Sequence, residues 1–233
     1  MKILAVDTAT KSCSVAMVEK GSLLAEVTMI REQTHSKHLM EMIQTVFDLS
    51  GLNLGEVDGY AVSRGPGTFT GLRIGISTVK GLAAASGKPV VGISSLDALA
   101  MQTSLSPYLV CPLLDARRDE VYCSRYRFQN GKMMKETEEN VFPPETAIRD
   151  INEPCLFVGN GARLYRTEIT DIMGDLAVFA PVFQNTIRAS TIAYLSAGRF
   201  EHGDTDDVGT LSPQYIRKSD AEINLANSGD SNR

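Results

Sequence analysis

Apolar runs in the first third of the chain predict three consecutive strands. The runs cover residues 2–6, 14–18 and 23–29, and short polar turns separate them. Such short connections favour antiparallel pairing, so we expect a meander. The first run ends in the polar turn Asp7-Thr8-Ala9-Thr10.

A predicted amphipathic helix follows, over residues 36–49. Its apolar side chains recur at helical spacing and form one broad face. These side chains are Leu39, Met40, Ile43, Val46 and Phe47. The pair Ser50-Gly51 is typical of a helix C-terminus.

A glycine-rich stretch, Ser63-Arg64-Gly65-Pro66-Gly67-Thr68-Phe69-Thr70-Gly71-Leu72-Arg73-Ile74-Gly75, then joins a short strand (59–63) to a second helix (68–86). Thr68 or Thr70 is a suitable N-cap. The turn at Gly65 and Gly67 fits a phosphate cradle and a packed turn about equally, because the usual phosphate-binding fingerprints are missing. Gly71 and Gly75 lie four residues apart on one helical face, which favours close packing of another backbone there.

The second half of the chain repeats this order. Strands are predicted over residues 108–114, 121–128 and 132–137, with a hairpin turn at Asn130-Gly131. Asp115 follows the first of them as Asp7 does in the first half, which indicates a duplication. We therefore expect an N-terminal lobe (1–105), a C-terminal lobe (106–218) and a disordered polar tail (219–233).

Composition and charge narrow the function classes. The chain has 233 residues, 43% of them hydrophobic, and a net charge of −5, so it lacks the general basic character of a protein that binds RNA alone. Its four cysteines show no C-x-x-C spacing and are expected to be buried, reduced thiols. A carboxylate at Asp7 argues against a secretory signal, and no run approaches the ~20 apolar residues of a membrane span. We expect a cytoplasmic protein without membrane contact.

Paired βββαβα halves with aspartate-led turns predict an α/β fold of the ASKHA class, the two-lobed architecture of actin, sugar kinases and the Hsp70 ATPase. In that architecture the opening turns face a nucleotide's phosphates, which makes an independent small-molecule kinase or ATPase one hypothesis, with Asp7 near Mg²⁺. The alternative is that these aspartates cap their turns. The candidate phosphate-turn residues are Asp7, Thr8, Thr10, Gly65, Gly67 and Asp115.

Other chemistry has weaker support. His35 and His38 lie three residues apart without further metal-ligating neighbours, so no metal site is predicted. A peptidase is disfavoured because no nucleophile–base pair can be assembled.

The motifs as a set resemble the TsaB (YeaZ) family. The resemblance rests on residues 3–10, the glycine-rich stretch, Val91-Gly92-Ile93-Ser94-Ser95-Leu96-Asp97, Asp115-Ala116-Arg117 with Glu120-Val121-Tyr122, and the closing Pro213-Gln214-Tyr215-Ile216-Arg217. It implies a role in forming N6-threonylcarbamoyladenosine at position 37 of tRNAs that read ANN codons. In that family the protein is the non-catalytic partner of the paralogue TsaD, and the ATPase TsaE completes the complex. The tRNA then binds through the complex, and ATP and a metal belong to the partner subunits. A homodimer is a further assembly to consider.

The same resemblance bears on catalysis and on the partner surface. TsaD-like proteins carry a metal-binding His-x-x-x-His that falls here at Ser95 and Leu99, which cannot ligate a metal as imidazole does. The two helices are expected to dock on their counterparts in TsaD as a four-helix bundle. The alternative is that both helices only cover their own sheet. The candidate interface residues are Leu39, Met40, Ile43, Val46, Phe47, Gly71, Leu72, Gly75, Ile76 and Val79.

Overall fold

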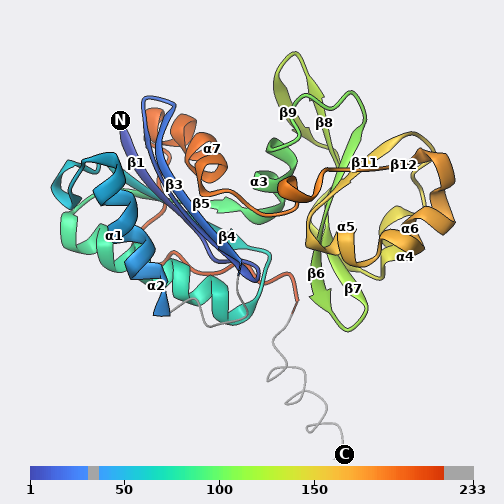
Figure 1. Cartoon of the computed structure of the whole chain (residues 1–233), viewed down its shortest axis with the longest axis horizontal. Helices are drawn as coiled ribbons and strands as arrows, with labels where there is room; N and C mark the ends of the chain where they lie inside the picture. Colours follow the sequence, from blue (N-terminus) through green and yellow to red (C-terminus); the bar gives the residue numbers. More distant parts are fainter. Residues whose placement is uncertain (31–36, 218–233) are drawn as a thin grey trace, which may run out of the picture.

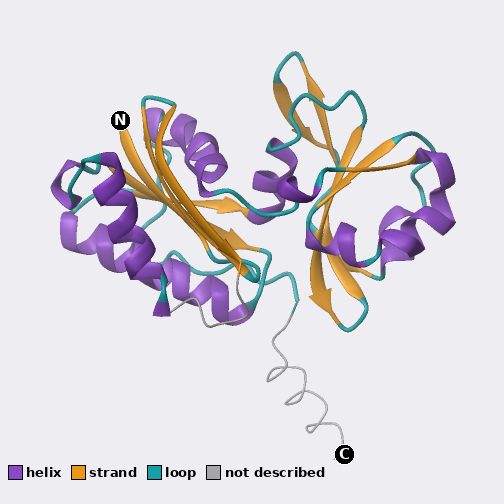
Figure 2. Ribbon diagram, viewed as in Figure 1, coloured by secondary structure: helices purple, strands orange, loops and turns teal. Residues whose placement is uncertain are grey.

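The chain folds into two α/β lobes that lie side by side (Figures 1 and 2). The computed structural model describes residues 1–30 and 37–217, so the expectations for His35 and for the tail at 219–233 lie outside the described residues. Each lobe has one mixed sheet with helices packed on it. Within the described ranges, no helix is both long and apolar enough to cross a bilayer.

The first lobe contains a five-stranded sheet in the order β3-β2-β1-β4-β5. Its strands are β1 (Lys2–Asp7), β2 (Ser12–Glu19), β3 (Ser22–Ile30), β4 (Gly59–Gly65) and β5 (Val90–Ser94). The first three form the predicted antiparallel meander, and β4 and β5 add in parallel to β1. The predicted order of elements is confirmed for this half of the chain.

The sheet of the second lobe, in the order β10-β7-β6-β11-β12, repeats the strand directions of the first. Its strands are β6 (Leu109–Arg117), β7 (Glu120–Cys123), β10 (Asn140–Phe142), β11 (Cys155–Val158) and β12 (Ala177–Phe179). The helices α4 (Pro144–Ile148), α5 (Asn160–Leu164) and α6 (Arg166–Met173) belong to this lobe. Because β6 occupies the place of β1, Asp7 and Asp115 sit at matching positions, as predicted.

The third strand of the second half was assigned wrongly. The turn at Asn130-Gly131 does connect two strands, β8 (Tyr126–Gln129) and β9 (Lys132–Lys135). This hairpin is an insertion beside the main sheet, however, and the strand that corresponds to β3 is β10. A strong local turn signal identifies a hairpin, but it carries no information about the strand on which that hairpin packs.

The predicted lobe boundary is also wrong at its C-terminal end. Helix α7 (Ala189–Glu201) falls within the predicted C-terminal lobe, but it packs on the first lobe, against the face of the sheet opposite α1 (Leu39–Ser50) and α2 (Phe69–Ser86) (Figure 1). Glu26 of β3 holds the start of α7 through Arg188 and through the backbone N–H of Ser190 at 3.0 Å. The chain therefore returns to the first lobe after building the second.

The two lobes share buried contacts and ion pairs. Helix α3 (Ser95–Met101) of the first lobe contributes Leu96 and Leu99 to a core that also contains Val110 and Tyr126 of the second. Above this core, Lys135 on β9 lies 2.8 Å from Asp97 on α3. The lobes are thus joined through α3, through α7 and through this ion pair.

The helices α1 and α2 cover one face of the first sheet, and their apolar stripes are buried there. Among the candidate interface residues, only Met40 has an exposed side chain, at 54%. The others are buried in this lobe, namely Leu39, Ile43, Val46, Phe47, Gly71, Leu72, Gly75, Ile76 and Val79. Val46, one of the candidate interface residues, is fully buried, because an amphipathic helix first uses its apolar stripe on its own sheet.

Candidate functional site

The opening turn of the first lobe is closed by the start of α2. The hydroxyl of Thr8 donates to the carbonyl oxygen of Gly71 at 2.7 Å, and the backbone N–H of Thr68 donates to the carbonyl oxygen of Ala9 at 2.7 Å. A Cβ atom on Gly71 would collide with the carbonyl oxygen of Thr8, and one on Gly75 would collide with the Thr8 hydroxyl. The packed-turn interpretation of this motif is therefore correct, and the group that approaches both glycines is Thr8 of the same lobe, through its backbone at Gly71 and through its side chain at Gly75.

Asp7 lies beneath this turn and is completely buried. One carboxyl oxygen accepts a hydrogen bond from the N–H of Ala9 at 3.2 Å. Burial raises the pKa of Asp7 to about 7, and the hydrogen bond from the Ala9 N–H opposes this shift. A carboxyl group with a raised pKa gives up its proton less readily, and Asp7 is also shut off from solvent, so it is poorly placed to hold Mg²⁺ at a nucleotide.

Asp115 opens a tighter turn in the second lobe. Its carboxylate accepts from the N–H of Arg117 at 2.8 Å, and its own N–H donates to the side-chain oxygen of Asn160 at 3.1 Å. The next three residues have left-handed backbone conformations, with φ of 63° at Arg117, 54° at Arg118 and 57° at Asp119. Residues other than glycine rarely adopt this conformation. The turn presents its side chains to solvent at the end of the β6–β7 hairpin.

A cleft of about 250 Å³ separates the two turns. From the first lobe it is lined by Thr10, Lys11, Ser12 and Ile30. From the second lobe it is lined by Asp115, Asn160, Arg163, Leu164, Val182, Asn185 and Thr186. Hydroxyl and amide groups line this cleft together with two cations, Lys11 and Arg163, and one carboxylate, Asp115, and the rest of the lining is mostly apolar.

The structure brings only part of the predicted phosphate-turn set to this cleft. Thr10 and Asp115 line it, whereas the side chains of Asp7 and Thr8 are buried away from solvent and Gly65 packs against Gln214. The sequence interpretation missed Lys11, Asn160 and Arg163. Asn160 lies in the turn Gly159-Asn160-Gly161, and that turn was the one signal that marked this region.

Metal ligands are absent from the place where the resemblance puts them. Ser95 and Leu99 occupy one face of α3, and both side chains are fully buried. In the described part of the chain, no three His, Cys, Asp or Glu side chains are grouped so that they would hold a metal ion.

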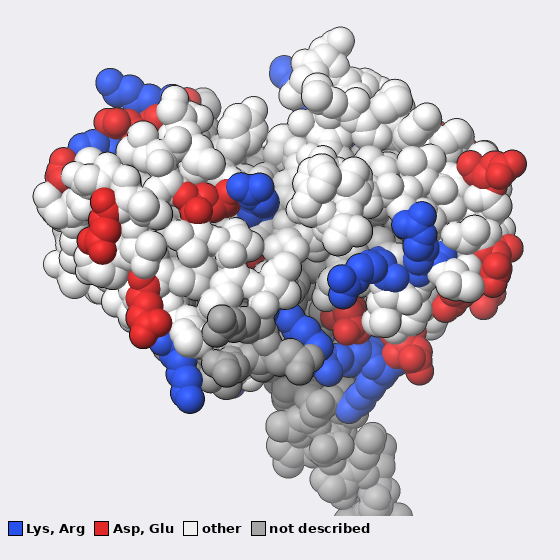
Figure 3. All heavy atoms as spheres, in the orientation of Figure 1, with Lys and Arg blue, Asp and Glu red and all other residues white. Residues whose placement is uncertain are grey.

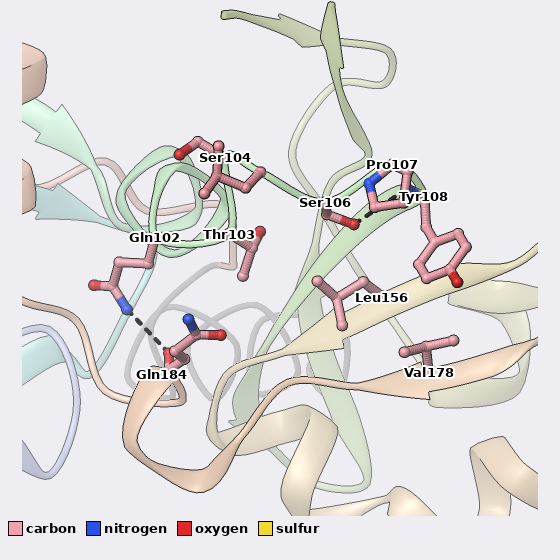
Figure 4. Close-up of a pocket in the computed structure, with 10 residues that line it drawn as sticks. Gln102, Thr103, Ser104, Ser106, Pro107, Tyr108, Leu156, Val178 and Gln184 are labelled. Carbon is pink, nitrogen blue, oxygen red and sulfur yellow. Dashed lines mark hydrogen bonds between the residues drawn. The ribbon is translucent and has the colours of Figure 1, made fainter.

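A second hollow, of about 330 Å³, lies beside the connection between the lobes (Figure 4). Leu156 of β11 and Val178 of β12 point into it, with Tyr108 at its edge (Figure 4). On its other side the Gln102 amide donates to the carbonyl oxygen of Gln184 at 3.0 Å. No charged side chain lines this hollow. The cleft between the turns is therefore the stronger candidate site.

Comparison with known proteins identifies relatives of similar length. The family model of TsaD, tRNA N6-adenosine threonylcarbamoyltransferase, matches residues 23–225. The Escherichia coli tRNA threonylcarbamoyladenosine biosynthesis protein TsaB is 31% identical over 94% of this chain and 96% of its own length. The Bacillus subtilis protein of the same name is 28% identical over 95% and 96%.

Solved structures that superpose on this chain include a protein of the same family. YeaZ from Pseudomonas aeruginosa superposes with a TM-score of 0.79 and 31% identity, over 92% of this chain and 99% of that one. The (R)-2-hydroxyglutaryl-CoA dehydratase component A of Acidaminococcus fermentans, at TM-score 0.53 and 11% identity over 85% and 99%, shares the fold alone. The predicted two-lobed ASKHA architecture is confirmed. The chain belongs to the TsaB (YeaZ) family, whose curated members named here are tRNA threonylcarbamoyladenosine biosynthesis proteins.

Proposed function

We propose that this protein is a scaffolding and activating subunit of the complex that forms N6-threonylcarbamoyladenosine at position 37 of ANN-reading tRNAs. In this proposal it pairs with a TsaD-like catalytic paralogue, and a TsaE-like ATPase joins the assembly. The tRNA binds through the complex, and ATP and the catalytic metal are held by the partner subunits. Family membership supports the pathway, and the residues of this chain support the non-catalytic role.

The burial of Ser95 and Leu99 carries the proposal. A hydroxyl and an isobutyl group in the core of α3 replace the two imidazoles that the family's catalytic branch uses, so this chain lacks those ligands. The buried, partly protonated Asp7 adds to this, because Mg²⁺ needs ionised oxygen ligands that it can reach.

The partner surface in this proposal is the outer face of α1 and α2. Met40 and Leu49 of α1 are 54% and 65% exposed, and α2 adds the exposed Ala84 and Ala85. Ile74 and Leu82 of α2 are half-buried, so apolar surface remains after the sheet is covered. Small and unbranched apolar side chains let helices approach closely, which suits a four-helix bundle with the paralogue or with a second copy of this chain.

The direct test is co-expression with the TsaD-like protein of the same organism. We expect the two chains to elute together in size-exclusion chromatography. Modified nucleoside should form, by liquid chromatography of digested tRNA, only when both chains and the ATPase are present.

The same assay distinguishes this proposal from the alternative of an independent kinase or ATPase. Turnover of ATP or modification of tRNA by this chain alone would overturn the proposal. So would full modification of tRNA when this chain is left out.

A further inference from the structure

Three exposed arginines lie on the second lobe near the cleft, and one of them, Arg163 of α5, lines the cleft itself. We call Arg117, Arg163 and Arg166 the cleft-edge arginines; all three side chains are exposed. Figure 3 shows basic side chains over α5 and at the end of the β6–β7 hairpin, although the chain as a whole carries a net charge of −5. Acidic side chains lie among them in the same view, so this part of the surface carries both signs of charge, with several basic groups close to the cleft (Figure 3).

Local structure brings these side chains together. Helix α5 packs on the end of β6, where Gly161 lies so close that a Cβ would meet the backbone of Leu113 at 2.9 Å. Asn160 ties the same helix to Asp115. Arg163 and Lys11 line one cleft, so the positive surface reaches across to the first lobe.

The guanidinium groups are largely uncompensated. The side chains of Arg117 and Arg163 make no ion pair with any residue that the structure describes. The guanidinium carbon of Arg166 lies 4.2 Å from the centroid of the Phe179 ring, a cation–π contact that holds the group and still leaves N–H donors for another acceptor.

Some of the nearby carboxylates already have hydrogen-bond or ion-pair partners. The carboxylate of Asp115 accepts the Arg117 N–H, and Glu120 pairs with Arg217 at 3.0 Å. Asp115, Asp119 and Glu168 all carry negative charge, and against them stand Arg117, Arg118, Arg163, Arg166 and Lys11, so the positive charges at the cleft and beside it outnumber the negative ones.

The surface suits an extended polyanion better than a small one. The cleft volume of 250 Å³ is below the roughly 300–1,000 Å³ of typical small-molecule sites. The arginines lie on its rim and beyond it, where a chain of phosphates can pass. Guanidinium groups bind phosphate through paired N–H donors.

We propose that the cleft-edge arginines bind the phosphodiester backbone of the tRNA while the partner subunit acts on the base. This proposal rests on the proposed function, and it names the surface of this chain that meets the RNA. Contacts of this kind add affinity and position the substrate without reading its sequence.

The test is a salt titration of labelled tRNA with the assembled complex, followed by fluorescence anisotropy. The variant Arg163→Gln/Arg166→Gln is compared with the control Lys88→Gln/Lys132→Gln, which loses the same charge at the end of α2 and on the β8–β9 hairpin. We expect the arginine variant to bind roughly tenfold more weakly and its slope of log affinity against log salt to fall by about 2, with the control near wild type. Both variants should melt at the wild-type temperature and co-elute with the partner.

Four results would overturn the proposal. One is an unchanged affinity and slope in the arginine variant, and another is an equal loss in the lysine control. A third is failure of the arginine variant to co-elute with the partner, which would make this surface a protein contact. The fourth is a loss of ATP binding, measured by calorimetry, in the arginine variant while its tRNA binding persists, which would assign the cleft to a nucleotide. Failure of the wild-type chain to co-elute with the partner would count against the proposed function instead.

Discussion

The hydroxyl of Thr8 donates a hydrogen bond to the carbonyl oxygen of Gly71 at 2.7 Å and so fastens the end of β1 to the first turn of α2. The bond is buried and connects residues 63 positions apart in the sequence. It closes the turn that follows the first strand of the sheet. The motif between residues 63 and 75 thus has a structural role in this protein.

The close approach of Thr8 to α2 predicts that replacing glycine by alanine has opposite effects on stability at two positions of this helix. Gly71→Ala places a methyl group against the Thr8 carbonyl, and we expect a loss of about 1–3 kcal/mol in the free energy of unfolding. Gly81→Ala on the exposed face of α2 meets no atom within 4 Å and should gain about 0.5–1 kcal/mol from helix propensity. Urea denaturation measures both. Equal effects of the two substitutions would contradict the packing argument.

The buried Asp7 predicts a pH-dependent stability. Its pKa is raised from 3.8 to about 7, so between these pH values the folded protein keeps the proton while the unfolded chain loses it. The contribution of Asp7 to stability is therefore present in full below about pH 4, falls as the pH rises towards 7, and stays low above it.

Asp7→Asn isolates this effect. The amide oxygen still accepts the Ala9 N–H and the side chain cannot ionise, so the variant should gain stability relative to wild type from about pH 4 to pH 7. The gain should reach on the order of 2–4 kcal/mol at pH 8. Asp7→Ala, which also loses the acceptor, should be less stable than Asp7→Asn by about 1 kcal/mol. Unfolding curves at several pH values would refute this account if the difference between wild type and Asp7→Asn did not change with pH.

Two methionines of similar exposure allow a matched test of the partner surface. Met40 on α1 and Met134 on β9 are 54% and 49% exposed. Met40→Asp should prevent co-elution with the TsaD-like partner, because a buried unpaired charge costs several kcal/mol, and Met134→Asp should not. Both variants should fold. Normal assembly of Met40→Asp would place the interface elsewhere.

Val46→Asp is expected to behave differently. Val46 is fully buried against the first sheet, so a carboxylate there should lower the free energy of unfolding by several kcal/mol. Thermal denaturation of the isolated chain measures this directly. A wild-type melting temperature for this variant would contradict the burial of Val46.

The ion pairs of Lys135 predict that the junction of the lobes contributes to the free energy of unfolding. Its ammonium lies 2.8 Å from both Asp97 and Glu139, and the Glu139 side chain is only 6% exposed. Lys135→Met should leave Glu139 buried without its counter-charge and cost about 1–3 kcal/mol. Lys132→Met, on the same strand but exposed at its end, should cost less than about 0.5 kcal/mol by denaturant titration.

The sequence by itself determined the fold class and most of the elements. Apolar runs ending in Asp7 and Asp115 marked the first strand of each half, and the spacing in the glycine-rich motif indicated the close backbone packing that the structure shows. These features are local or periodic, so they can be recognised without knowing which segments meet. The motifs around Asp7, Gly65 and Asp115 also sufficed to identify the family.

Only the tertiary structure decided where those elements pack. The return of α7 to the first lobe, the insertion of the β8–β9 hairpin, and the inward orientation of Val46 all depend on contacts between distant segments. The cleft has the same origin, because Lys11, Asn160 and Arg163 come from segments about 150 residues apart in the chain and carry no shared spacing. Hydrophobic periodicity says that a face will be buried, whereas the surface that buries it is chosen by the free energy of the whole packed core.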